Sequence, residues 1–132
     1  MVKAIIHAVC LTSWRFCAWA CPGRSIPCEA GAQHANPMGT LHGGMLCDIA
    51  DAAMGMAYAS TRGDGETCPT LELKINFLKP VWQARRQAIG RVVKPGRTAG
   101  LVECDTLDAN GALIARATST CMTLRSDQGC GR

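Results

Sequence analysis

The longest apolar stretch of the chain lies within residues 36–60, NPMGTLHGGMLCDIADAAMGMAYAS. From Met45 onward, Ala, Met, Leu and Ile fall on nearly every side of a helical projection, and Asp48 and Asp51 stand inside this apolar run. A helix that is apolar all round belongs in a core. About seventeen residues at roughly 1.5 Å each give a rod of about 25 Å, long enough to cross a small domain. The pattern therefore predicts one buried central helix with a sheet wrapped around it.

Apolar and polar residues alternate along residues 70–78, which is typical of a half-buried strand. Further strands are predicted at 84–93, 98–107 and 113–124, separated by a turn at 94–97 and a hairpin signal at 108–111. Pro22 and Pro27 restrict an earlier strand to a short one at about 24–30, because proline is confined to sheet edges or bulges. One helix followed by consecutive antiparallel strands is the α+β pattern in which a sheet covers a helix.

The chain of 132 residues is of ordinary size for one domain. We expect the folded domain to span residues 29–125, followed by a frayed tail at 126–132. Residues 1–28 are difficult to interpret beyond a possible short helix. Their apolar start resembles a signal-peptide core, but His7 and Arg15 interrupt it and no clean cleavage site follows, which argues against a leader.

Composition excludes several classes of function. The chain is 48% apolar and 18% charged, its formal charge is +4, and no run of like charges marks a nucleic-acid or membrane tail. No apolar stretch reaches the roughly 18 residues of a membrane span. The nine cysteines are an odd number without the spacing of metal ligands, so we expect reduced thiols in a cytoplasmic protein, with no metal and no cofactor.

Candidate chemistry gathers at the start of the predicted helix. His42-Gly43-Gly44 brings an unobstructed backbone to the first helical turn, where amides without internal acceptors suit an anion or a polarised carbonyl oxygen. Asp51 lies about two turns further on, where an unpaired carboxylate in apolar surroundings costs several kcal/mol. The simpler interpretation is that the glycines allow tight packing and that the aspartates favour the helix dipole, which fits Asp48 better than Asp51.

Two motifs stand at fixed spacing in the central part of the chain. The first is Asn-Pro-x-Gly-Thr-x-His-Gly-Gly at residues 36–44, with Asp51 nine positions after His42. The second is Thr-x-Glu-x-Lys-x-Asn-Phe-x-x-Pro at residues 70–80. In order, spacing and residue type these motifs resemble the hotdog-fold acyl-CoA thioesterases, in the branch named for phenylacetic acid degradation (PaaI-type). The resemblance extends over roughly residues 29–125 and implies a hotdog fold, an antiparallel sheet around one central helix.

The resemblance also implies roles in thioester hydrolysis. Asp51 is expected to act as general base on water or as direct nucleophile, and sequence does not separate the two. The backbone N–H of Gly44, with Gly43 nearby, is expected to donate to the thioester oxygen. By resemblance, His42 and Asn36 orient the thioester or the water, and Thr70 holds the water near Asp51. The alternatives are a turn histidine bonded to a carbonyl and an ordinary strand threonine.

Substrate binding is expected at a basic turn and in a tunnel. The turn would hold the nucleotide end of CoA, although basic residues on a strand are more often a solvated face. The tunnel for the acyl chain would be lined from the helix and a partner subunit, because hotdog domains pair into dimers, or dimers of dimers, with the acyl-CoA site at the dimer interface. The turn comprises Lys94, Gly96, Arg97 and Thr98, and the expected tunnel residues are Met45, Met54 and Tyr58.

Three other functions compete with hydrolysis. A non-catalytic acyl-CoA sensor would keep the fold and the CoA contacts but would be expected to lack Asp51. Hotdog hydratases place an Asp and a His in a different motif, which is not found here. A purely structural oligomer would have little use for Asn36, His42 and Asp51 at these spacings.

Overall fold

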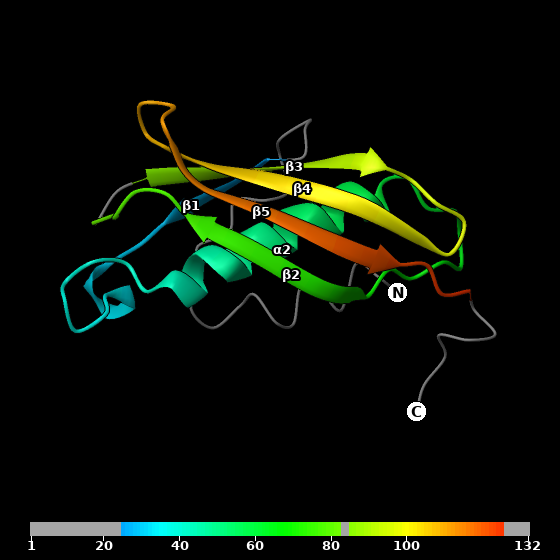
Figure 1. Cartoon of the computed structure of the whole chain (residues 1–132), viewed down its shortest axis with the longest axis horizontal. Coiled ribbons are helices and arrows are strands. Elements are labelled where there is room, and N and C mark those ends of the chain that lie inside the picture. The colour runs from blue at the N-terminus through cyan, green and yellow to red at the C-terminus, as the bar shows by residue number, and fades with distance from the viewer. Residues whose placement is uncertain (1–24, 83–84, 126–132) are drawn as a thin grey trace.

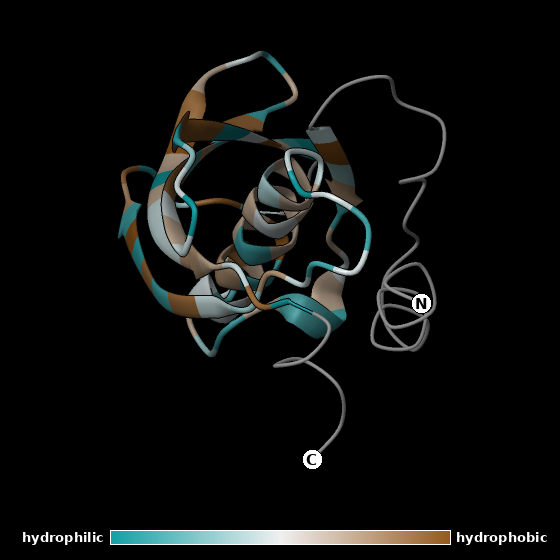
Figure 2. Ribbon diagram, turned by 90° about the vertical axis from the view of Figure 1, so that its right-hand side faces the viewer, coloured by the Kyte–Doolittle hydropathy of each residue, from teal (hydrophilic) through white to brown (hydrophobic). Residues whose placement is uncertain are grey.

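The computed structural model describes residues 25–82 and 85–125, and the expectations for residues 1–24 and 126–132 lie outside the described residues. Within these residues five antiparallel strands form one sheet in the order β1-β3-β4-β5-β2, and this sheet curves around one long helix, α2 (Figures 1 and 2). This arrangement is the predicted hotdog layout. The elements are β1 Ser25–Glu29, the 3-10 turn η1 Ala32–His34, α2 Gly43–Ala59, β2 Thr70–Phe77, β3 Arg85–Lys94, β4 Ala99–Asp108 and β5 Leu113–Met122.

Each predicted strand is present within one or two residues of its expected bounds. The short strand β1 lies at the sheet edge, as its proline predicts, with Pro27 opposite Gln87 of β3. In the hairpin between β4 and β5, Gly111 takes φ +80°, and the Asp108 carboxylate accepts hydrogen bonds from the amides of Asn110 and Ala112. The local turn chemistry therefore sets this connection.

The helix is buried on one side only, which corrects the expectation of a helix enclosed all round. The curved sheet covers the face that carries Ile49 and Ala53, both buried, whereas Asp48 and Asp51 are exposed on the other side. The helix residues buried against the sheet are Leu46, Ile49, Ala50, Ala53, Met54, Ala57 and Tyr58. A single sheet of five strands covers one side of a helix, so residues 25–82 and 85–125 of one chain leave the second side open.

Helix and sheet approach each other closely at Gly90 of β3. A Cβ atom built at Gly90 would lie 2.2 Å from the carbonyl oxygen of Ala53, so glycine is required for this contact. Cys104 and Cys121 are fully buried in the same core, as expected for small core residues. Burial raises the pKa of the Cys104 thiol to about 11, which keeps it protonated at neutral pH.

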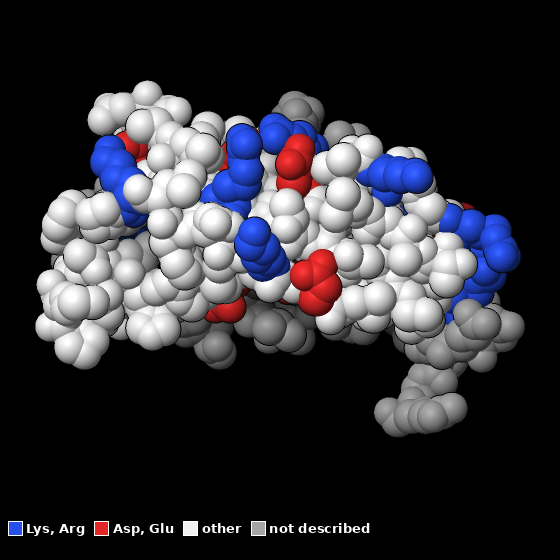
Figure 3. All heavy atoms as spheres, viewed as in Figure 1, with Lys and Arg blue, Asp and Glu red and all other residues white. Residues whose placement is uncertain are grey.

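The outer face of the sheet is charged in its middle part (Figure 3). Asp105 of β4 accepts two hydrogen bonds from Arg116 of β5, which lowers the pKa of the Asp105 carboxyl. The β2 edge of the sheet is different, because among the described residues β2 pairs with β5 alone and carries Leu71 and Phe77 with 58% and 53% of their surfaces exposed. The unpaired backbone groups of such an apolar edge can pair with a strand of another chain.

A buried cation interrupts the inner face of β3. Arg86 is 3% exposed, and its Nη2 donates to the carbonyl oxygen of Trp82. Its Nε and Nη1 have no hydrogen-bond partner in the described part of the chain. The neighbouring thiol of Cys28 offers no formal negative charge, because burial raises its pKa to about 11. Burial in turn lowers the pKa of Arg86.

Replacing Arg86 with methionine is expected to stabilise the protein. The substitution removes a buried charge that has no counter-ion among the described residues and keeps much of the side-chain volume. Even the replacement of a buried ion pair by well-packed apolar side chains is often neutral or stabilising by about 1–4 kcal/mol. We expect a gain of about 1–2 kcal/mol in the free energy of unfolding, measured by urea denaturation followed by circular dichroism. Arg85→Met, at the exposed neighbouring position, serves as the control and should change little. A loss of stability in Arg86→Met would contradict this account.

Candidate active site

The two residues Asp51 and Thr70 meet in the structure. The Thr70 hydroxyl donates a hydrogen bond to Asp51 Oδ1 at 2.8 Å, and both residues are exposed in the single chain. Thr70 begins β2 and Asp51 lies midway along α2, so the contact joins the sheet edge to the open side of the helix. Asp51 is therefore a solvent-accessible carboxylate with one donor fixed beside it.

Asp48 lies one turn before Asp51 and is also exposed. Among the described residues the Asp48 carboxylate accepts no hydrogen bond and makes no ion pair, whereas the Asp51 carboxylate accepts one from Thr70. This difference in partners, together with the spacing from His42, favours Asp51 as the carboxylate with a chemical role. From the sequence, the family spacing and the depth of Asp51 in the helix, beyond the reach of the dipole, both favour Asp51.

The start of α2 has a defined hydrogen-bond arrangement. His42 is the N-cap residue, and its Nδ1 accepts a hydrogen bond from the Gly44 amide at 3.0 Å. His42 therefore bonds an amide and not a carbonyl. The Gly43 amide has no acceptor among the described residues, and the ring of Phe77 lies so close that a Cβ at Gly43 would be 2.9 Å from it. The predicted donor, the Gly44 amide, is thus bonded to His42, whereas the neighbouring Gly43 amide is unpaired among the described residues.

The loop before the helix is organised by Asn36. Its side-chain oxygen accepts from the amides of Met38 and Thr40, and its Nδ2 donates to the Thr40 hydroxyl at 2.8 Å. The amide of His42 donates to the carbonyl oxygen of His34 at 2.9 Å, which ties η1 to the helix start. Sequence reasoning missed Thr40 and His34, although Thr40 stood within the motif.

The predicted basic turn lies at the opposite end of α2 from His42. Lys94, Arg97 and Thr98 are exposed, and basic side chains gather at this end of the molecule (Figure 3). Arg62 was not predicted, yet its Nη1 donates to the carbonyl oxygen of Gly96 at 3.0 Å and its guanidinium lies 4.6 Å from the centre of the Tyr58 ring. Arg62 thus fixes the turn and adds a third cation to it.

The structure corrects the expected tunnel lining. Met54 and Tyr58 are fully buried against the sheet, and the Tyr58 hydroxyl is 3.0 Å from Thr123 Oγ1. Both therefore belong to the core, because the helix turns them toward the sheet. Met45 is half-buried at the first turn of α2 and stays a candidate.

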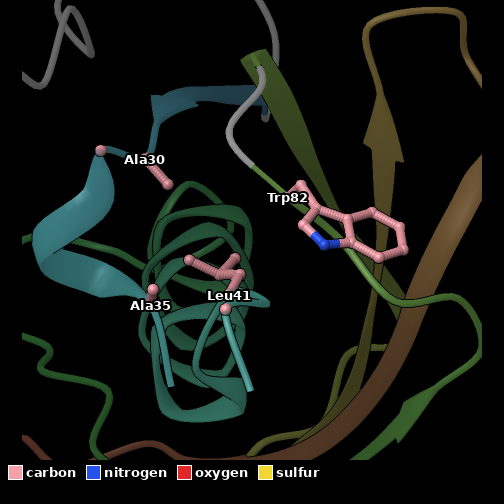
Figure 4. Close-up of a pocket in the computed structure, with 6 residues that line it drawn as sticks. Ala30, Ala35, Leu41 and Trp82 are labelled. Carbon is pink, nitrogen blue, oxygen red and sulfur yellow. The ribbon is translucent and has the colours of Figure 1, made fainter. Parts of the chain in front are cut away.

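A small hollow beside the loop before α2 is lined mainly by apolar groups (Figure 4). Its volume of about 20 Å³ is far below the roughly 300–1,000 Å³ of typical ligand sites, and neither Asp51 nor Thr70 lines it. It is lined by Ala30, Gly31, Ala35, Gly39, Leu41 and Trp82. Within the described residues, one chain alone therefore does not enclose an acyl-CoA beside Asp51.

The described residues contain neither a metal-binding cluster nor a membrane-spanning helix. Residues 25–82 and 85–125 contain no group of three or more His, Cys, Asp or Glu side chains placed to hold a metal ion. In the same part of the chain, no helix has both the length and the hydropathy needed to cross a membrane.

Comparison with known sequences identifies the family. The model of the thioesterase superfamily matches residues 38–115. A provisionally named esterase of Saccharolobus solfataricus is 39% identical over 88 residues, which are 67% of this chain and 62% of that protein. Human acyl-coenzyme A thioesterase 13 is 32% identical over 105 residues, 76% of this chain and 74% of that protein. The chain spans 62% and 57% of the lengths of the first two curated relatives that it matches.

Solved structures agree with the sequence comparison. A phenylacetic acid degradation-related protein from Ralstonia eutropha, provisionally named a thioesterase, is 29% identical with a TM-score of 0.71, covering 92% of this chain and 91% of that one. The BH2602 protein from Bacillus halodurans, solved with CoA, is 27% identical with a TM-score of 0.72, covering 76% and 66%. With the hotdog sheet, the helix and both motifs in place, the chain belongs to the thioesterase superfamily, in its PaaI-type branch.

Proposed function

We propose that this protein is an acyl-CoA thioesterase, which hydrolyses the thioester of an acyl-CoA to a free acid and CoA. The observation that carries the proposal is Asp51, an exposed carboxylate on the open side of α2 with the Thr70 hydroxyl 2.8 Å away. A carboxylate that water can reach can act as general base or attack the thioester carbonyl itself. Both routes stay open.

The proposed site needs two chains. Gly43 and Asp51 are eight residues apart on one helix, about 12 Å along its axis. One thioester carbonyl cannot contact an amide and a carboxylate so far apart. Two copies whose helices pack antiparallel would bring the Gly43 amide of one against Asp51 of the other. The exposed apolar edge of β2 supports such a dimer, alone or within a dimer of dimers.

The start of α2 is suited to the oxyanion that forms as the thioester is attacked. In the described part of the chain the Gly43 amide of the first turn has no acceptor, and the helix dipole adds partial positive charge there. The Gly44 amide becomes a second donor once the His42 imidazole rotates away from it. His42 can then contact the thioester or the water. Donors of this kind typically stabilise the transition state by about 3–4 kcal/mol each.

Hydrolysis of a panel of aryl-, short-chain and long-chain acyl-CoAs tests the proposal. Thiol release is measured at catalytic enzyme concentration, so that the protein's own nine cysteines contribute little signal. We expect release from at least one class, and none above background with Asp51→Asn. The alternative function is a non-catalytic acyl-CoA sensor. Tight binding of acyl-CoA without any thiol release would favour it.

Arg97→Ala is expected to raise KM for acyl-CoA far more than it lowers kcat. Arg97 is exposed and has no ion pair among the described residues, so it is free to meet a phosphate of CoA. A phosphate contact remote from the thioester binds substrate and transition state alike. For a short thioester that lacks the nucleotide, Arg97→Ala should change neither KM nor kcat. Equal losses with both substrates would mean that the basic turn serves the fold and not the ligand.

A further inference from the structure

The contact between Thr70 and Asp51 depends on an irregularity in the sheet. Along β2 and β5, Thr70 stands opposite Cys121 and Glu72 stands opposite Thr120, so Leu71 is an extra residue. In a regular strand Thr70 and Glu72 would point to the same face, away from the helix. The extra residue turns Thr70 to the inner face, where its hydroxyl reaches Asp51.

Two side-chain hydrogen bonds hold this β-bulge. The Thr120 amide donates to Glu72 Oε1 at 2.9 Å, and the buried Ser119 hydroxyl donates to the carbonyl oxygen of Glu72 at 2.8 Å. An extra residue interrupts the regular backbone hydrogen bonds between two strands. Here the side chains of Glu72 and Ser119 supply hydrogen bonds to the backbone at that point. Both bonds converge on Glu72, the residue that follows the bulge.

Glu72 is exposed, but its contacts differ from those of a freely solvated side chain. Among the described residues it has no ion pair with a lysine or an arginine, although Lys74 lies on the same outer face of β2. Its carboxylate is bonded to a backbone amide of the neighbouring strand instead. A hydrogen bond from this side chain to the backbone of β5 helps to fix the register of β2 against β5.

We propose that Glu72 is a positioning residue of the active site. Its carboxylate holds the bulge, the bulge turns Thr70 toward the helix, and Thr70 fixes Asp51. This inference rests on the proposed function of Asp51. It assigns a role to the third residue of the second motif, which the mechanism above does not use.

The test compares Glu72→Ala with Glu72→Gln. Alanine removes the acceptor of the Thr120 amide, whereas glutamine keeps a carbonyl oxygen there. We expect Glu72→Ala to lower kcat about tenfold, the low end for loss of a hydrogen bond to a charged group, with KM changed less than about twofold. Glu72→Gln should keep kcat within about twofold. Lys74→Ala, two residues further along the same face, is the matched control and should leave kcat unchanged. Equal kcat in Glu72→Ala and wild type would overturn the proposal.

A double-mutant cycle with Thr70→Val separates positioning from general destabilisation. If Glu72 acts through Thr70, Glu72→Ala adds less than about a twofold loss of kcat in the Thr70→Val background. Two losses that multiply would show that Glu72 acts by another route and would overturn the proposal.

A structural measurement distinguishes this proposal from the proposed function. In Glu72→Ala, nuclear Overhauser contacts between the Thr70 methyl group and α2 should disappear and the Thr120 amide should exchange faster with solvent. If wild type hydrolyses no acyl-CoA, the proposed function fails, and this measurement still decides whether Glu72 sets the bulge. Contacts that persist in Glu72→Ala would overturn the role of Glu72 whatever the activity.

Discussion

Asp51→Asn is expected to lower kcat for acyl-CoA hydrolysis by at least about 100-fold, with little change in KM or melting temperature. Asparagine keeps the shape of the side chain and can still accept the hydrogen bond from Thr70, but it removes the basic or nucleophilic oxygen. The loss of a general base typically costs about 10²–10⁴ in rate. Steady-state kinetics on the best substrate of the panel, with thermal unfolding in parallel, measures both effects.

Asp48→Asn is the matched control for this prediction. Asp48 is on the same open side of α2, one turn earlier, and its carboxylate has no hydrogen bond among the described residues. We expect kcat to stay within a few-fold of wild type, and the helix to lose at most about 1 kcal/mol of dipole stabilisation. An inactive Asp48→Asn beside an active Asp51→Asn would refute the assignment and with it the role carried over from the family.

The elements of this fold could be predicted because local signals agree with the final structure. The helix of Gly43–Ala59 follows from its apolar run, and the hairpin before β5 follows from Asp108 and Gly111. Strand β1 is short and at the edge because it contains Pro27. These features depend on residues that are close together in the sequence, so the sequence alone is enough to predict them.

The missed features depend on residues far apart in the sequence. The burial of Met54 and Tyr58 depends on which side of the helix the sheet covers, and the apolar run looked alike on all sides. The bulge at Leu71 is invisible in the alternation of residues 70–78, which reads as regular. It is set by Ser119 and Thr120 on another strand. Likewise, Arg62 is far from the basic turn in the sequence, and the fold brings its side chain to the carbonyl oxygen of Gly96.

The choice between the two glycine amides also needed the structure. From the sequence, Gly44 was the expected donor with Gly43 nearby, since both follow His42. The structure shows the Gly44 amide bonded to His42 Nδ1, which leaves the Gly43 amide as the donor that needs no rearrangement. The two amides differ because the N-cap residue is a histidine, whose Nδ1 accepts the hydrogen bond of the amide two residues later, at Gly44.

Gly43→Ala is expected to lower kcat by about 10²–10³, the typical cost of one lost oxyanion donor. The new methyl group would lie 2.9 Å from the Phe77 ring, so the first turn of α2 must shift and carry its amide with it. Phe77→Leu in the same protein removes the ring and should recover part of kcat. Light scattering and thermal unfolding check that both variants keep the assembly and the fold. An active Gly43→Ala with unchanged KM would contradict a role for this amide.

Mixing the two inactive variants tests whether each site is shared between chains. If Gly43 of one chain faces Asp51 of the other, a heterodimer of Asp51→Asn and Gly43→Ala has one intact site and one doubly defective site. After random exchange of equal amounts, half of the dimers are heterodimers, so the mixture should regain about a quarter of wild-type activity per chain. Sites built within one chain would leave the mixture inactive. The 12 Å or so between these residues along one helix is the reason to expect recovery.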